Sequence, residues 1–178
     1  MNTSLKKLLF ISASAALICA GAFIKIPIGV VPVSLQTMFV LAIGLLLPLS
    51  ISLPSVLTYL VLGIVGLPVF TGGGGISIIT GPTGGYLIGL IPAVIILYLF
   101  GRNKNIFLWI IGSLLANSAI YICGLLMLKN VLNLDFKSAL SVGLFPFIIG
   151  DIIKTAVAIT VSYKLKDKIN KIFKPETA

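Results

Sequence analysis

The chain has 178 residues, of which 58% are hydrophobic and 10% are charged, and its mean hydropathy is +1.20. A soluble globular domain carries charge at about a quarter of its positions, so this composition excludes a soluble enzyme and leaves no room for a separate nucleotide-binding domain. The net charge of +9 comes from Lys and Arg at the ends of apolar segments, which indicates contact with a lipid bilayer rather than with nucleic acid.

The apolar segments predict an all-α integral membrane bundle of six transmembrane helices, in a single domain that covers residues 1–178. One crossing needs about 20 apolar residues, so this length allows roughly six of them. The predicted spans are 8–26, 33–48, 51–69, 85–101, 106–128 and 142–165. Pro32, Pro48 and Pro54 bound or break the second and third spans, because proline cannot continue a regular helix.

The first predicted span carries a small side chain at every fourth position, namely Ser12, Ala16 and Ala20. A stripe of this kind lets another helix approach closely within a membrane. The spacing is equally compatible with packing inside the bundle and with docking of a partner subunit.

The loop at residues 70–84 is the most glycine-rich part of the chain. A phosphate-binding loop places Lys and then Ser or Thr after its last glycine. Here Tyr86 and Leu87 follow, so the loop is not expected to be an ATP site. A flexible linker and a lid over a pocket are the two interpretations.

The isoleucines within this loop favour a lid, because they would pack against something. Glycine-rich backbone can present amide groups to an anion. We therefore expect the lid to bring backbone amides and polar groups to a ligand carboxylate, with Gly73, Gly74, Thr83, Gly84 and Tyr86 as the candidate residues.

The last span contains two ionisable residues, Asp151 and Lys154, near the middle of the predicted helix. Each costs about 2.5–3.5 kcal/mol on membrane-insertion scales. Their spacing of three residues puts them on one helix face, where they can pair with each other. A structural salt bridge is one interpretation, and a ligand site facing the bundle interior is the other.

Other polar side chains lie at helical spacing in the second and fifth spans. Asn117 and Tyr121 share one face of the fifth span, and Gln36 and Thr37 begin the second. Hydrogen bonds between helices would explain each pair separately. Together with Asp151, they predict a pocket for a small molecule with a polar head and an apolar body.

The composition offers few of the side chains that catalysis or metal binding would need. The chain has no histidine, and its four carboxylates are Asp135, Asp151, Asp167 and Glu176, which are far apart in sequence. We therefore expect no catalytic residues, no metal site and no cofactor.

Basic residues set the expected orientation. With both termini in the cytoplasm, Lys25, Lys129 and Lys137 lie outside, and the Lys and Arg that lie inside are Lys6, Lys7, Arg102, Lys104, Lys164, Lys166, Lys168, Lys171 and Lys174. The positive-inside rule favours this arrangement in the cell membrane. It places the loops 25–32 and 70–84 on the external side.

Several motifs occur in order along the chain. They are Ile26-Pro27, Val31 to Thr37 with the letters VPVSLQT, Gly66 to Phe70 with GLPVF, Gly81 to Leu87 with GPTGGYL, Ala116-Asn117, Pro146-Phe147, and Gly150 to Lys154 with GDIIK. In combination they resemble the BioY family, the biotin-specific substrate-binding subunits of energy-coupling factor (ECF) transporters.

The resemblance implies a six-helix subunit that binds biotin from outside and passes it to a transmembrane coupling protein with two ATPase subunits. It also implies that Ala16 and Ala20 form the docking surface for the coupling protein. Biotin has a ureido head with two N–H donors and one carbonyl, an apolar bicycle and a carboxylate, so Asp151, Lys154, Asn117 and Gln36 are suited to the head.

Three alternatives stay open at this point. The first is a related substrate-binding subunit for another vitamin, such as thiamine or riboflavin. The others are a small membrane enzyme and a structural pore protein.

Overall fold

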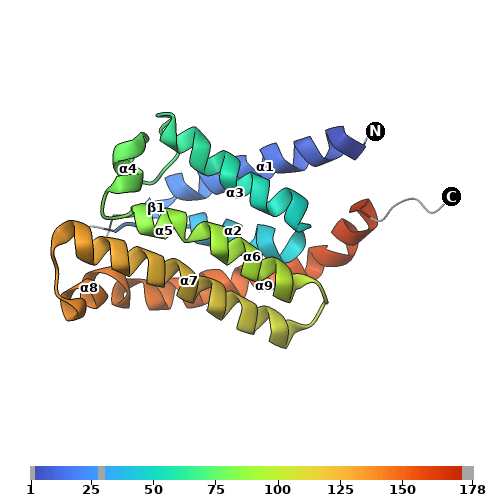
Figure 1. Cartoon of the computed structure of the whole chain (residues 1–178). Coiled ribbons are helices and arrows are strands. Elements are labelled where there is room, and N and C mark those ends of the chain that lie inside the picture. Colours follow the sequence, from blue (N-terminus) through green and yellow to red (C-terminus); the bar gives the residue numbers. More distant parts are fainter. Residues whose placement is uncertain (1–2, 28–30, 174–178) are drawn as a thin grey trace.

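The protein folds as a mostly helical bundle, described here by a computed structural model over residues 3–27 and 31–173 (Figure 1). Lys174, Glu176 and the centre of the predicted external loop 25–32 lie outside the described residues. The helices are α1 Thr3–Phe23, α2 Gln36–Leu46, α3 Leu49–Ile64, α4 Ile76–Thr80, α5 Gly84–Ile88, α6 Leu90–Gly101, α7 Ile106–Leu132, α8 Phe136–Gly143 and α9 Ile148–Phe173, with a 3₁₀ turn at Phe145–Phe147. Two short strands, β1 Lys25–Ile26 and β2 Val33–Ser34, pair antiparallel.

Four helical stretches are long and apolar enough to cross a membrane: Thr3–Phe23, Gly84–Gly101, Ile106–Leu132 and Phe136–Phe173. Two shorter apolar helices, α2 and α3, account for the other two predicted spans. The chain is therefore mostly α-helical and carries several candidate spans, while six crossings remain a prediction.

The predicted limits of the first span need correction. The first helix ends at Phe23 instead of continuing to residue 26, because Lys25 and Ile26 pair with Ser34 and Val33. The loop 70–84 contains a short helix, α4, at residues 76–80.

The predicted last span, 142–165, is not one continuous helix at its N-terminal end. Gly143 ends α8, Pro146 lies in the 3₁₀ turn, and α9 begins only at Ile148. Proline lacks the N–H that a continuous helix would use, so the chain breaks here. Asp151 therefore lies in the first turn of α9 and not near the middle of a helix.

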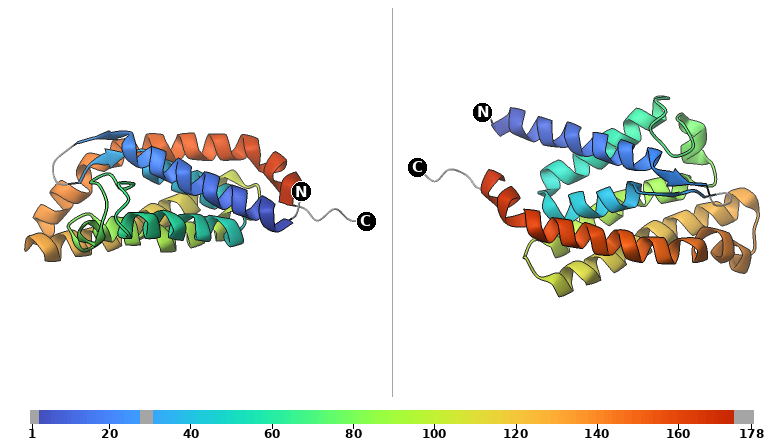
Figure 2. Two further views of the ribbon diagram at one scale, coloured as in Figure 1. Left: turned by 90° about the horizontal axis from the view of Figure 1, so that it is seen from above. Right: turned by 180° about the vertical axis from the view of Figure 1, so that it is seen from behind.

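Helix α2 is short and lies at the centre, where it packs against α1, α6 and α9. Figure 2 shows it from behind, between α1 and α9. Close packing with α6 depends on Gly44, because a Cβ atom there would lie 2.6 Å from Cβ of Leu97. The largest buried side chains around it include Ile18, Leu41 and Leu97. Such contacts hold helices together in lipid, where no hydrophobic force drives them together.

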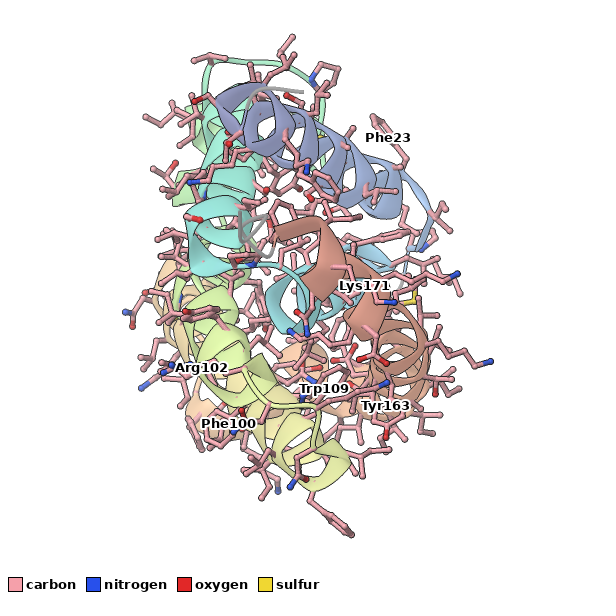
Figure 3. All side chains as sticks on the ribbon, turned by 90° about the vertical axis from the view of Figure 1, so that its right-hand side faces the viewer. Phe23, Phe100, Arg102, Trp109, Tyr163 and Lys171 are labelled. Atoms are coloured by element: carbon pink, nitrogen blue, oxygen red, sulfur yellow. The ribbon has the colours of Figure 1, made fainter. Side chains whose placement is uncertain are left out.

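The start of α1, the α6–α7 connection and the end of α9 lie at one end of the bundle (Figure 1). Lys6 donates to the carbonyl of Ile172 at 3.1 Å, and Lys104 pairs with Asp167 at 2.6 Å. Figure 3 views this end, where the rings of Trp109 and Tyr163 meet edge to face. The β1–β2 pair, α4 and α8 lie at the opposite end.

Lys166 closes the C-terminal end of α2 at the same end of the bundle. It is 6% exposed, and its Nζ donates to the carbonyl of Leu45 at 2.6 Å and to that of Leu46 at 3.4 Å. The last carbonyls of a helix have no partner within the helix, and a cation there is favourable. α9 thus supplies the partner that α2 lacks.

We predict that Lys166→Met destabilises the protein by about 1.5–3 kcal/mol, because buried carbonyls lose a charged donor. Methionine keeps most of the apolar stem, so the loss reports the hydrogen bonds. Thermal unfolding in one detergent measures it. Lys168→Met, at an exposed position on the same helix, is the control, and equal melting temperatures for the two variants would contradict the prediction.

Candidate functional site

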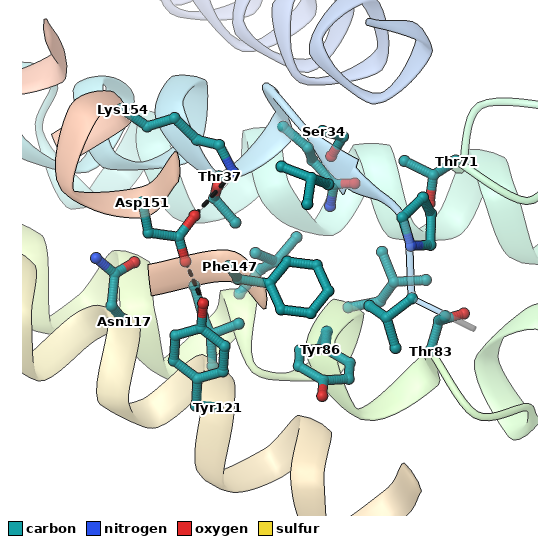
Figure 4. A pocket seen from close by; sticks show the side chains of 17 residues that line it. Ser34, Thr37, Thr71, Thr83, Tyr86, Asn117, Tyr121, Phe147, Asp151 and Lys154 are labelled. Carbon is teal, nitrogen blue, oxygen red and sulfur yellow. Dashed lines mark hydrogen bonds and ion pairs between the residues drawn. The ribbon is translucent and has the colours of Figure 1, made fainter. Parts of the chain in front are cut away.

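A cavity opens at the end of the bundle that carries the β1–β2 pair (Figure 4). Segments from five parts of the chain form it: residues 31–37, the loop and α5, the start of α6, the middle of α7, and the region from Phe147 to the first turns of α9. The lining residues are Val31, Pro32, Val33, Ser34, Gln36, Thr37, Thr71, Thr83, Tyr86, Leu87, Leu90, Asn117, Ile120, Tyr121, Phe147, Asp151 and Lys154. Apolar and polar side chains both line the cavity, and Asp151, Lys154 and Tyr121 gather on one side.

Asp151 and Lys154 form the charged part of this cavity. Lys154 Nζ lies 2.8 Å from Asp151 Oδ1, and the two side chains are 8% and 15% exposed, respectively. The hydroxyl of Tyr121, on α7, donates to the other oxygen, Asp151 Oδ2. A carboxylate oxygen has two lone pairs, so each oxygen can still accept a hydrogen bond from a ligand.

The remaining polar groups of the cavity differ in whether they already have partners. Asn117 Nδ2 donates to Thr155 Oγ1 at 3.2 Å, and Gln36 is 6% exposed at the start of α2. Thr37 Oγ1 is buried and has no hydrogen-bond partner within the described part of the chain. An unpaired buried hydroxyl is costly, so Thr37, which the sequence places beside Gln36, is a candidate ligand contact.

Tyr86 contributes its ring to the cavity but not its hydroxyl. The hydroxyl donates to the carbonyl of Gly143 at 2.9 Å and points away from the cavity (Figure 4). The ring meets that of Tyr121 edge to face, with 6.3 Å between the centroids. Tyr86 therefore shapes an aromatic wall and also ties α5 to the end of α8.

The glycines selected from the sequence do not line the cavity, although Thr83 does. Gly84 packs so closely that a Cβ atom would lie 1.7 Å from the carbonyl oxygen of Ile79, and one at Gly74 would lie 2.2 Å from that of Leu67. Gly73 has φ +120°, which favours glycine. In this structure the three glycines shape the loop, and their contact with a ligand stays a prediction.

The glycine-rich loop is attached to the β1–β2 pair beside the cavity. The exposed Lys25 of β1 donates through Nζ to the carbonyl of Thr71, which itself lines the cavity. Two segments separated in sequence thus meet at the rim. An opening of the loop would break this hydrogen bond.

Sequence reasoning missed most of the cavity wall. The apolar members Val31, Val33, Leu90, Ile120 and Phe147 look like ordinary core residues in a hydrophobic chain. Three of them nevertheless carry a local signal, because Val31 and Val33 flank Pro32 and Phe147 follows Pro146. The polar residues were found because polarity is rare in these spans.

The small-residue stripe of α1 faces outward. Ser12, Ala16 and Ala20 are exposed. They line a shallow apolar groove with Thr58 and Leu62 of α3. The stripe is therefore not used for packing within the chain, which leaves it free for another helix.

A comparison of the sequence with models of protein families identifies the family of this chain. The model of the BioY family matches residues 1–171, nearly the whole length. The chain belongs to the BioY family.

Individual relatives agree with this assignment. The chain is 40% identical over 153 residues to a biotin transporter BioY of Thermotoga maritima, a match that covers 85% of this chain and 90% of the relative. It is 39% identical to a probable biotin transporter BioY of Pyrococcus horikoshii, covering 90% and 96%.

A solved structure agrees as well. The structure of the S-component for biotin from an ECF-type ABC transporter superimposes with a TM-score of 0.82 at 31% sequence identity, covering 94% of this chain and 95% of that one. The two chains therefore share one fold over nearly their full length.

The hydroxyl of Tyr86 gives a test of the contact between α5 and the end of α8. We predict that Tyr86→Phe lowers the free energy of unfolding by about 0.5–1.5 kcal/mol, because the carbonyl of Gly143 loses its donor. Tyr98→Phe is the control, since the Tyr98 hydroxyl makes no hydrogen bond within the described residues. Chemical unfolding of both variants measures the difference, and an unchanged midpoint for Tyr86→Phe would sink the prediction.

Proposed function

We propose that the chain takes up biotin as the substrate-binding subunit of an ECF-type ABC transporter. The observation that carries this proposal is the cluster of Asp151, Lys154 and Tyr121 at one side of a cavity that also has an apolar and aromatic wall. Membership of the BioY family and the similarity to the biotin S-component support it. The chemistry of this family is transport and not catalysis.

The cavity suits biotin in the order of its chemical groups. Asp151, Lys154 and Asn117 lie on one side, Thr71 and Thr83 lie on the opposite side, and Phe147 and Tyr86 lie between them (Figure 4). The ureido head would give an N–H to Asp151 and receive a hydrogen bond at its carbonyl from Lys154. The bicycle and chain would contact the aromatic wall, and the carboxylate would lie beside the threonines and the loop.

The loop at residues 70–84 would then act as a lid over the carboxylate end. Its attachment through Lys25 and Thr71 supports this role. Backbone amides of Gly73, Gly74 and Gly84 would face the carboxylate after a rearrangement of the loop.

The placement in the membrane is part of the same proposal. Six spans, with α2 and α3 as short crossings, would put both termini in the cytoplasm and the cavity near the external surface. Basic residues at the end that holds the start of α1 and the end of α9 support this orientation. The outward stripe of α1 would dock a transmembrane coupling protein, which two ATPase subunits would energise.

We predict that Asp151→Asn or Lys154→Ala weakens biotin binding by about 3–5 kcal/mol, because each removes a ligand contact and leaves a buried charge unpaired. Isothermal titration of biotin into detergent-purified protein measures the loss. Failure of the unmodified protein to bind biotin would refute the proposed ligand.

The double variant Asp151→Asn with Lys154→Met separates ligand contact from structural pairing. Replacing both partners removes the cost of an unpaired charge. A pair that contacts ligand gives a folded double variant that still binds poorly. Recovery of nearly normal affinity would mean that the pair is structural only.

For the docking surface, we expect Ala16→Trp combined with Ala20→Trp to abolish assembly with the coupling protein and to leave biotin binding nearly unchanged. Two indoles would fill the groove that a partner helix needs. Ile111→Trp with Leu115→Trp, at exposed positions of α7 also four residues apart, is the matched control. Co-purification and titration measure both properties, and loss of both together would place the stripe inside the bundle.

For the lid, we expect Lys25→Ala to accelerate biotin dissociation about two- to fivefold, because the loop loses one hydrogen bond at the rim. Lys129→Ala, at another lysine predicted to lie outside, is the control. Release of labelled biotin into excess unlabelled biotin gives the rate. Equal rates for the two variants would argue against a lid held by Lys25.

A further inference from the structure

Two hydrogen bonds connect α7 to α9 one helical turn apart. Tyr121 donates to Asp151, and Asn117 Nδ2 donates to Thr155 Oγ1 at 3.2 Å. The two pairs are four residues apart on each helix, so the two hydrogen bonds lie one helical turn apart along the contact between α7 and α9. The first hydrogen bond holds the carboxylate of Asp151 in the cavity, and the second holds the amide of Asn117 beside it.

Thr155 lies outside the cavity that Asn117 lines. It borders a groove on the outer side of α7 and α9, which it shares with Asn117, Tyr121 and Asp151. A ligand in the cavity therefore meets Asn117 directly and Thr155 only through it. The hydrogen bond from Asn117 is thus a direct link between Thr155 and a side chain that lines the cavity.

The bond to Thr155 holds the plane of the Asn117 amide, and in the structure Nδ2 is the atom that faces Thr155. An amide has one acceptor oxygen and an NH₂ group with two donors. With Nδ2 turned to Thr155, the oxygen lies on the side of Asp151 and Tyr121 (Figure 4). If the amide were reversed, its NH₂ group would face the side where Tyr121 and Lys154 already donate to Asp151.

We infer that Thr155 is a positioning residue that holds Asn117 with its amide oxygen toward the cavity, where this oxygen accepts a ureido N–H of the ligand. The inference rests on the proposed function, since it needs biotin in the cavity. The ureido head has two N–H donors and one acceptor, which Asp151, Asn117 and Lys154 then match in number and sense. Thr155 thereby contributes to specificity without contact with biotin.

Substitution of the hydroxyl tests this inference. Thr155→Val keeps the shape and removes the hydroxyl, so biotin affinity falls about tenfold as the amide loses its partner. Thr155→Ser restores the hydroxyl and keeps affinity within about twofold of the original. Thr160→Val is the control on the same helix, because the Thr160 hydroxyl bonds only to the carbonyl of Ala156 at 2.8 Å. Gel filtration in detergent verifies that each variant is folded.

A double-variant cycle distinguishes positioning from a general structural role. In the Asn117→Ala background, Thr155→Val should change biotin affinity by less than about twofold, because the group on which it acts is gone. An equal tenfold loss with and without Asn117 would overturn the inference, and so would a failure of Thr155→Ser to restore binding. Biotin binding by the unmodified protein tests the proposed function separately.

Discussion

The ion pair of Asp151 and Lys154 is the constraint on which the ligand end of the structure depends. Charges removed from water are stable only when they are paired and hydrogen-bonded. Lys154 supplies one partner from the same helix, and Tyr121 supplies another from α7. The break at Pro146 places Asp151 in the first turn of α9, where a helix N-terminus favours a negative charge. The helix break at Pro146, the ion pair with Lys154 and the hydrogen bond from Tyr121 of α7 therefore all stabilise the charge of Asp151.

The sequence predicted most of the secondary structure, and its main error has a local cause. Long apolar runs can only be helices in lipid, because every backbone polar group needs an internal partner there. The run from residue 136 to 173 is apolar enough to be read as one span. Hydropathy does not register the loss of one backbone donor at Pro146, so the start of α9 was placed too early.

The candidate site could be predicted only where a side chain contrasts with its surroundings. Asp151, Lys154, Asn117, Tyr121 and Gln36 stand out in apolar segments, and the structure brings all five to one cavity. Wall residues such as Leu90 and Ile120 have no such contrast. The direction of a side chain is likewise absent from the sequence, as Tyr86 shows, since only its ring reaches the cavity.

The buried residues of α9 include Lys154, Ala158, Ser162 and Lys166, one every fourth position. This row begins with the lysine of the cavity and ends with the lysine that closes α2. Each residue turns a helix by about 100°, so one residue inserted or deleted between the two lysines would rotate one of them away from its partner. The length of α9 between these positions is therefore fixed by two separate contacts, and beyond Lys166 the helix makes further contacts, with Lys104 through Asp167 and with Lys6 through the carbonyl of Ile172.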